Sequence, residues 1–259
     1  MITSKGNEQV KAAIRLRESA KERGARGLFF LEGFRLCMDA IASGYVPQAI
    51  FITEAARTKY DISGADAILV SEIVAQKLAD TKTPQGIFGV FGSKAKQDFW
   101  QSGARYIALE QVQDPGNLGA IARTAEALGL DGLLVGGGCD VYHPKALRAS
   151  MGSLLRLPVL ECDDLVKEIA SCDLQCYAAV PGEGAVSINN CDFSNGAVIL
   201  IGNEGSGLSE NAIKACDMRV TIPMPGKAES LNAAAAAAIL MWEMMKSCEI
   251  DARTKPLQK

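Results

Sequence analysis

Short apolar runs and amphipathic segments alternate along most of the chain. Apolar runs of strand length predict strands at residues 27–33, 49–53, 67–70, 86–91, 105–110, 132–135, 175–180, 198–201 and 220–222. Apolar residues at helical spacing predict helices at 7–23, 72–79, 117–128, 144–151 and 164–171, another ending at Ala42, and an alanine-rich helix capped by Glu229 or Ser230. This alternation favours a mostly parallel sheet with helices over both faces.

A polar stretch that begins at Ser93 (SKAKQDFWQS) interrupts the alternation. Domain boundaries commonly fall in polar segments of this kind. We therefore predict a small α/β domain over residues 1–93, a linker over 94–103 and a second α/β domain over 104–259.

The composition is that of a globular chain with a sizeable core, because 48% of its 259 residues are hydrophobic and 22% are charged. A net charge of −3 and an isoelectric point near 5.4 argue against binding of nucleic acid by bulk charge alone. The first 35 residues nevertheless carry eight Lys or Arg against four Glu. This excess is consistent either with a localised anionic partner or with a solvated helix face.

The chain has eight scattered cysteines without a CxxC pair, which is typical of reduced thiols. It opens on a polar segment rather than a signal peptide, and its longest apolar run is far shorter than the ~20 residues that span a bilayer. We therefore expect a cytoplasmic protein. His143 is the single histidine, so most metal sites and most Ser-His or Cys-His nucleophiles are excluded, and no bound metal is expected.

Two glycine-rich or proline-rich loops follow apolar runs near the end of the chain, at 202–207 and 223–226. Open α/β sheets bind ligands at such strand ends, where glycine lets the backbone approach the ligand. The first loop approximates a phosphate-binding loop, but Leu208 replaces the essential lysine and Glu204 adds a negative charge. Binding of a nucleoside triphosphate is therefore not expected. The glycines at 136–138 do not form a dinucleotide-binding fingerprint.

Polar residues gather near the ends of successive predicted strands: Asn117, Arg123, Glu204, Ser230 and Asn232. A single arginine on a helix more often makes a structural salt bridge. Here its association with carboxamides, a carboxylate and glycine loops favours a functional site.

Three ordered segments resemble the motifs of the SpoU/TrmH family of S-adenosylmethionine-dependent RNA ribose 2′-O-methyltransferases. They are residues 114–125 (DPGNLGAIARTA), 201–209 (IGNEGSGLS) and 222–232 (IPMPGKAESLN), and the resemblance extends from Arg105 to about Lys246. The segment 30–33 (FLEG) resembles the family's ribosomal-protein-like substrate-binding domain, so residues 1–93 would bind RNA.

The resemblance implies a catalytic domain with a deep trefoil knot, a topology that general rules of chain connection would reject. It also implies a homodimer packed through the knot region. S-adenosyl-L-methionine would be held by the backbone at Gly202, Ile222 and Leu231, with Ile201 and Met224 beside them.

The resemblance gives Arg123 the part of activating the 2′-hydroxyl. A guanidinium is almost wholly protonated at neutral pH and is therefore a poor base, so we favour a phosphate clamp that also stabilises the developing alkoxide. Asn117, Ser230 and Asn232 would orient Arg123 and the ribose, and Glu204 would pair with Arg123 or another cation. The alternative for Glu204 is a carboxylate at a helix N-terminus near Ser209.

The expected function is methylation of the 2′-hydroxyl of a ribose in RNA, with 23S ribosomal RNA favoured because of the additional N-terminal domain. Transfer RNA is the alternative substrate. A non-catalytic RNA-binding or ribosome-assembly factor is the alternative class, against which the filled motif positions argue.

Overall fold

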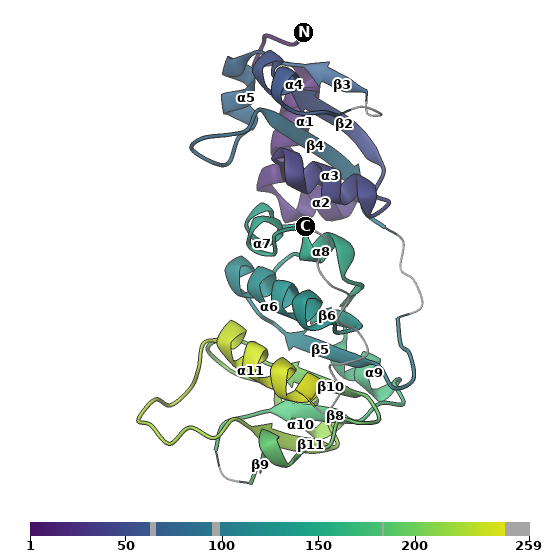
Figure 1. Cartoon of the computed structure of the whole chain (residues 1–259), viewed down its shortest axis with the longest axis vertical. Coiled ribbons are helices and arrows are strands. Elements are labelled where there is room, and N and C mark those ends of the chain that lie inside the picture. Colours follow the sequence, from purple (N-terminus) through teal and green to yellow (C-terminus); the bar gives the residue numbers. More distant parts are fainter. Residues whose placement is uncertain (63–65, 95–98, 183, 247–259) are drawn as a thin grey trace. The chain divides into compact units, whose positions relative to one another are not determined.

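The computed structural model describes residues 1–62, 66–94, 99–182 and 184–246 (Figure 1). Internal contacts divide the chain into two compact units, Met1–Gln97 with Asp140–Arg156 and Asp98–Cys139 with Leu157–Lys259. Part of the predicted linker, 95–98, lies outside the described residues, as does the end of the predicted second domain. The division at 93 and 104 stays a prediction.

The first unit has a four-stranded mixed sheet in the order β1-β4-β2-β3. Strand β4 is antiparallel to both of its neighbours, and β3 is parallel to β2. The elements are α1 (Glu8–Glu18), α2 (Ala20–Arg26), β1 (Leu28–Glu32), α3 (Phe34–Ala42), β2 (Pro47–Ile52), α4 (Glu54–Lys59), β3 (Ala67–Leu69), α5 (Glu72–Leu78), β4 (Ile87–Gly92), α7 (Pro144–Ala149) and α8 (Ser153–Arg156). One buried cluster joins Phe30, Phe51 and Phe88 of the sheet to Val10 of α1 and Val74 of α5.

The helix predicted over 7–23 is two helices, because the chain leaves the helical region at Ser19 (φ −126°, ψ 114°). The Ser19 hydroxyl accepts a hydrogen bond from the backbone N–H of Glu22 and so caps α2. Ser19 and Glu22 have the spacing of a capping box, a signal that the apolar periodicity concealed.

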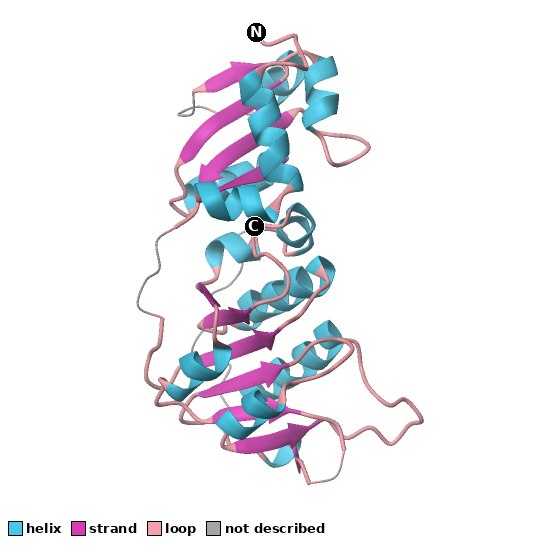
Figure 2. Ribbon diagram, turned by 180° about the vertical axis from the view of Figure 1, so that it is seen from behind, coloured by secondary structure: helices cyan, strands magenta, loops and turns pink. Residues whose placement is uncertain are grey.

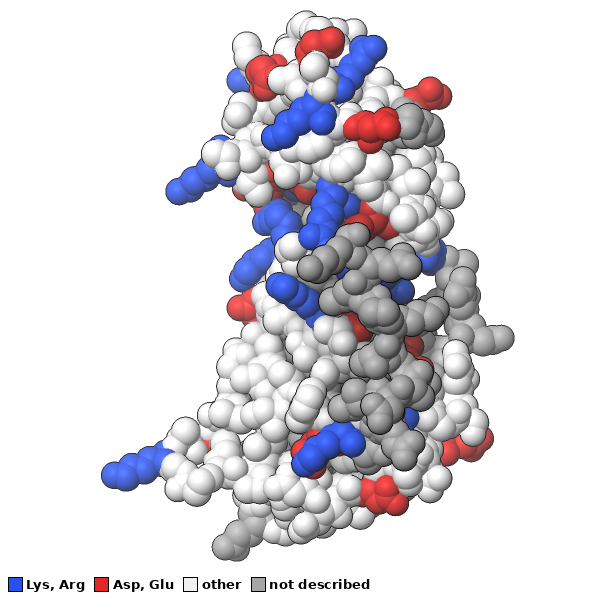
Figure 3. Space-filling view, viewed as in Figure 1, with Lys and Arg blue, Asp and Glu red and all other residues white. Residues whose placement is uncertain are grey.

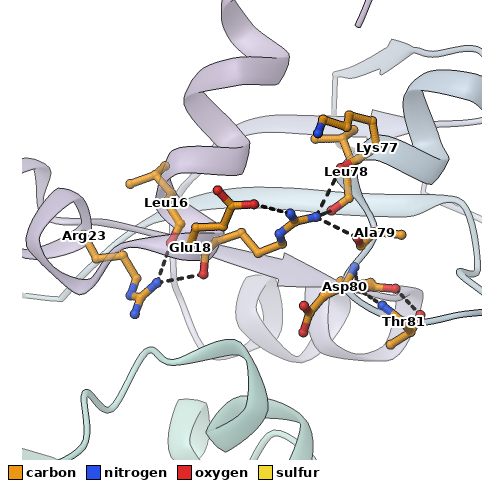
Figure 4. A network of polar contacts seen from close by, with 10 residues as sticks. Leu16, Glu18, Arg23, Lys77, Leu78, Ala79, Asp80 and Thr81 are labelled. Carbon is orange, nitrogen blue, oxygen red and sulfur yellow. Dashed lines mark hydrogen bonds and ion pairs between the residues drawn. The ribbon is translucent and has the colours of Figure 1, made fainter.

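The basic residues of this region mostly serve the fold. Arg17 donates hydrogen bonds to the carbonyl oxygens of Lys77, Leu78 and Ala79, where a cation complements the C-terminal end of α5 (Figure 4). Ion pairs join Lys11 to Glu8, Arg17 to Glu18, Arg23 to Asp140, Arg26 to Glu22, and Arg35 to Asp39. Two of these pairs, Arg23–Asp140 and Arg35–Asp39, use an acid outside the first 35 residues, so they offset two of the four excess positive charges. Both interpretations given above therefore stay open. On the face shown in Figure 3, positive and negative side chains are interspersed over this unit.

The segment Asp140–Arg156 belongs to the first unit through several contacts. Arg23, only 5% exposed, pairs with Asp140 at 2.5 Å, and the ring of Tyr142 stacks on Phe29 with centroids 4.4 Å apart. His143 caps α7 by accepting a hydrogen bond at Nδ1 from the backbone N–H of Lys145. Burial, followed by the charge of Arg23, lowers the pKa of His143, so the neutral capping form is favoured.

The second unit contains a seven-stranded sheet in the order β7-β6-β5-β10-β8-β11-β9, and every pairing is parallel. Its elements are β5 (Arg105–Glu110), α6 (Pro115–Leu128), β6 (Gly132–Gly136), β7 (Val159–Cys162), α9 (Leu165–Ala170), β8 (Cys176–Ala179), β9 (Val186–Ser187), a 3-10 turn (Ile188–Asn190), β10 (Ala197–Ile201), α10 (Glu210–Ala215), β11 (Met218–Thr221) and α11 (Ala233–Lys246). Helices α6 and α11 lie on one face and α9 and α10 on the other (Figures 1 and 2).

This arrangement confirms the predicted parallel α/β fold of the second domain. Sequence patterns missed the short strands β7 and β9 and the short helices α4, α8 and α10, whose lengths give little periodic signal. Among the described helices, none is long and apolar enough to cross a bilayer.

Candidate active site

A cavity of about 450 Å³ lies at the carboxyl ends of the adjacent strands β8, β10 and β11. This is the edge of a parallel sheet where ligands are expected to bind. Its walls come from residues 179–181 after β8, 201–208 after β10, 220–222 and Met224 at and after β11, and 230–233, Ala236 and Leu240 at the start of α11. The predicted residues Ile201, Gly202, Glu204, Ile222, Met224, Ser230, Leu231 and Asn232 all line it.

The loop after β10 folds back tightly on itself. Asn203 and Gly207 exchange two backbone hydrogen bonds, of 3.1 and 2.9 Å. A Cβ at Gly202 would lie 2.1 Å from the carbonyl carbon of Gly207 and 2.2 Å from the nitrogen of Leu208. The loop itself therefore leaves no room for a side chain at this position, in addition to the expected close approach of a ligand.

The Glu204 carboxylate pairs with amides. Its oxygens accept hydrogen bonds from the backbone N–H groups of Gln113 and Asp114, each 3.1 Å long, and from Nδ2 of Asn117 at 2.9 Å. The expected ion pair with Arg123 or another cation is absent from the described part of the chain. Glu204 instead fixes the turn between β5 and α6.

Asn117 continues this connection to α11. Its Oδ1 accepts a hydrogen bond of 3.0 Å from Nδ2 of Asn232, and Oδ1 of Asn232 accepts from the N–H groups of Ala234 and Ala235. Asn232 is therefore the cap of α11, in place of the predicted Glu229 or Ser230. One chain of hydrogen bonds runs from Glu204 through Asn117 to Asn232.

The pKa of Glu204 lies below its ordinary value of 4.5. Partial burial opposes this shift, but the hydrogen bonds from Asn117, Gln113 and Asp114 favour the charged carboxylate and outweigh it. Because folding lowers the pKa of Glu204, the ionised carboxylate stabilises the folded chain fully at any pH above 4.5. This stabilisation is lost as the pH falls through the lower pKa of the folded state. The connection is intact at neutral pH.

Arg123 lies on the exposed face of α6 and does not line the cavity. Within the described residues its guanidinium has no hydrogen bond and no ion pair. Asn117 and Asn232, predicted to orient Arg123 and the ribose, instead bond to each other, and Asn117 also bonds to Glu204. The structure thus brings together all the predicted site residues except Arg123.

The sequence did not predict two further polar contacts near the cavity. Glu110 ends β5 and accepts hydrogen bonds from both the N–H and the hydroxyl of Ser209, at 2.7 and 2.6 Å. The carboxylate beside Ser209 is therefore Glu110 rather than Glu204. Asn203 donates to the carbonyl oxygen of Gln111 at 2.8 Å. The position of Glu110 at the end of a predicted strand could have identified it as a site residue.

A parallel α/β sheet with a ligand-sized cavity at the carboxyl ends of its strands is typical of domains that bind a small molecule. A model of the SpoU rRNA methylase family matches residues 104–242, and a model of the MRM3-like substrate binding domain matches residues 7–89. The chain belongs to the SpoU rRNA methylase family.

Relatives agree over nearly the whole chain. The 23S rRNA (guanosine(2553)-2′-O)-methyltransferase RlmP of Bacillus subtilis is 31% identical over 247 residues, which cover 94% of this chain and 98% of that protein. The AdoMet-bound rRNA methyltransferase from Sinorhizobium meliloti has a TM-score of 0.84 and 30% identity, covering 95% and 97% of the two chains. The SpoU methyltransferase AviRb from Streptomyces viridochromogenes, solved with AdoMet, has a TM-score of 0.81 and 26% identity, covering 93% and 98%.

These findings confirm the predicted family, the RNA 2′-O-methyltransferase class and S-adenosyl-L-methionine as the cofactor. The trefoil knot, the division into domains and the roles of individual site residues stay predictions.

Replacing Gly202 with alanine should displace the loop after β10 and weaken S-adenosylmethionine binding at least tenfold, or ~1.4 kcal/mol. Gly226→Ala is the matched control, because Gly226 does not line the cavity and a Cβ there would meet nothing within 4 Å. Titration calorimetry of both variants measures the difference. Equal affinity in the two would show that the packing of Gly202 does not shape the cofactor site.

Proposed function

We propose that this chain transfers a methyl group from S-adenosylmethionine to the 2′-hydroxyl of a ribose in 23S ribosomal RNA. The observation that carries the proposal is the cavity at the ends of β8, β10 and β11, connected to α6 through Glu204 and Asn117. Its position on this sheet, in a chain similar throughout its length to a 23S rRNA 2′-O-methyltransferase, supports this reaction and this RNA.

The cavity fits the cofactor. A volume of about 450 Å³ is within the range of sites for small ligands, ~300–1,000 Å³. Ile201, Ile222, Met224 and Leu231 supply apolar walls for an adenosyl group, and the irregular backbone at 202 and 222–224 supplies polar groups without a phosphate-binding lysine. When bound, the cofactor supplies a methyl group that a nucleophilic oxygen can displace from its sulfonium without a metal.

Arg123 acts as a phosphate clamp. Its exposed guanidinium, free of partners among the described residues, can form two parallel hydrogen bonds to a phosphate group of the bound RNA. The charge also favours an alkoxide forming at the adjacent ribose. Asn117 and Asn232 hold the loops on which the ribose rests, and Ser230 lines the same cavity.

Residues 1–93 form the RNA-binding domain, residues 94–103 the linker and residues 104–259 the catalytic domain. The match of residues 7–89 to a substrate-binding domain supports this division. Since most cations before residue 36 are paired, the exposed Arg57, Lys59 and Lys82 are better candidates for phosphate contacts. Lys59 also lies over the ring of Tyr60, 5.1 Å from its centroid, so a cation and an aromatic face are presented together.

The active form is a homodimer that packs through α11 and the predicted knot. Helix α11 exposes the side chains of Ile239 and Trp242, which are 41% and 54% accessible. The two residues are three positions apart and therefore lie on the same face of the helix. Aromatic residues of this kind are enriched at protein interfaces. The protein acts in the cytoplasm, which its scattered cysteines without a CxxC pair support.

The substrate is tested by transfer of labelled methyl groups to 23S rRNA and to tRNA, each transcribed without modifications. We expect incorporation into 23S rRNA at a single ribose and little into tRNA. Preferential labelling of tRNA would identify it as the substrate, and binding of rRNA without transfer would favour a non-catalytic assembly factor.

Arg123→Lys keeps the charge but loses the planar fork of donors, so single-turnover methylation should fall at least tenfold. Cofactor affinity should be unchanged, because Arg123 does not line the cavity. Arg219→Lys, also exposed, is the matched control. An active lysine variant whose pH–rate profile moves to lower pH would indicate a base rather than a clamp.

Trp242→Glu should convert the dimer to a monomer, because it places a charge on the exposed face of α11. Ile73→Glu is the control, since Ile73 is 61% exposed on α5 and lies outside the proposed interface. Light scattering gives the mass of each variant. A dimeric Trp242→Glu protein would exclude this interface.

A further inference from the structure

Three thiols gather at the amino-terminal edge of the parallel sheet, opposite to the edge that holds the cavity. Cys172 follows α9, Cys176 is the first residue of β8, and Cys216 follows α10. They pack in one cluster with the surrounding apolar side chains. The sulfur atoms of Cys172 and Cys176 are 3.7 Å apart and share a hydrogen bond.

The backbone holds this pair in place. The N–H of Cys172 donates to the carbonyl oxygen of Ile169, and the N–H of Cys176 donates to the carboxylate of Asp217 at 2.8 Å. Both thiols also face the carbonyl oxygen of Leu174, at 3.8 and 3.4 Å. Hydrogen bonds of the backbone after α9 and at the start of β8 thus fix the positions of both cysteines, and the shared contact with the Leu174 carbonyl brings their sulfurs together.

We propose that Cys172 and Cys176 form a reversible redox site that a peroxide oxidises to an intramolecular disulfide. No part of the methyl transfer uses this pair.

The reaction balances with hydrogen peroxide as the oxidant. The Cys172 thiolate attacks one peroxide oxygen, the O–O bond breaks, and the departing hydroxide takes up a proton to form water. The Cys176 sulfur then displaces the hydroxyl from the resulting sulfenic acid. An S–S bond forms and a second water is released, so the two thiols lose two protons and two electrons while the peroxide is reduced to two waters.

The environments of the two sulfurs assign these roles. Cys172 is half-buried, whereas Cys176 is buried. The hydrogen bond from Cys176 lowers the pKa of Cys172 to about 7, against the opposing effects of burial and of Asp217. The same hydrogen bond and burial raise the pKa of Cys176. Cys172 is thus the sulfur that peroxide meets as a thiolate, and Cys176 is the resolving thiol.

Closure requires only a small movement. A disulfide bond is ~2.05 Å long, so the two sulfurs must approach by roughly 1.7 Å. The bond would join the end of α9 to the start of β8 and replace two weak contacts to the Leu174 carbonyl.

The test treats the full chain with hydrogen peroxide, alkylates the remaining thiols and examines the tryptic peptide 168–214 by mass spectrometry. We expect it to lose two hydrogens, with the bond located between Cys172 and Cys176, and to regain them with dithiothreitol. Cys191→Ser is the matched control, because Cys191 lies in the same peptide and faces the carbonyl of Ser187. It should still form the disulfide.

Single-cysteine variants separate the two roles. In Cys176→Ser, the sulfenic acid should persist at Cys172 and be trapped by dimedone, whereas Cys172→Ser should yield neither adduct nor disulfide. Thiols that stay reduced in the wild-type chain, or direct passage of Cys172 to sulfinic acid without a disulfide, would overturn the proposal.

Discussion

The carboxylate of Glu204 joins loops that lie about ninety residues apart in the sequence. It accepts two backbone N–H groups from the turn before α6 and one amide N–H from Asn117, and Asn117 in turn accepts from the residue that caps α11. All three hydrogen bonds are solvent-exposed, so water can replace Glu204 as the acceptor and each bond contributes only ~0.5–1.5 kcal/mol. The main contribution of this carboxylate is to hold the two loops in one relative position.

The parallel sheet places the Glu204 carboxylate at the edge where the cavity lies. Strands β8, β10 and β11 are adjacent and parallel, so their carboxyl ends and the loops after them meet at one edge. The tight turn at Gly202 directs Glu204 towards α6, and Glu110 fixes the other end of the same loop through Ser209. The site thus uses polar contacts to position loops and apolar side chains to receive a ligand.

Much of this organisation was predictable, because apolar runs identify β5, β6, β8 and β10 and the three motifs identify the residues that line the cavity. The hydrogen-bond partners of the site residues were not predictable. A carboxylate can pair with a guanidinium or with amides, and the spacing of residues in the sequence does not decide between them. Glu204 was therefore assigned to Arg123 or another cation, and the cap of α11 was predicted at Glu229 or Ser230 instead of Asn232. The break at Ser19, which caps α2, was also missed, because the amphipathic pattern continues across it.

A crystal structure of the chain with S-adenosylmethionine would test most directly whether the loops joined by Glu204 form the cofactor site. We expect the adenosyl group within the cavity, hydrogen-bonded to the backbone at Gly202, Ile222 and Leu231, with the bonds of Glu204 to Gln113 and Asn117 retained. Cofactor bound elsewhere on the sheet, or bound in the cavity only after Glu204 has released α6, would contradict it.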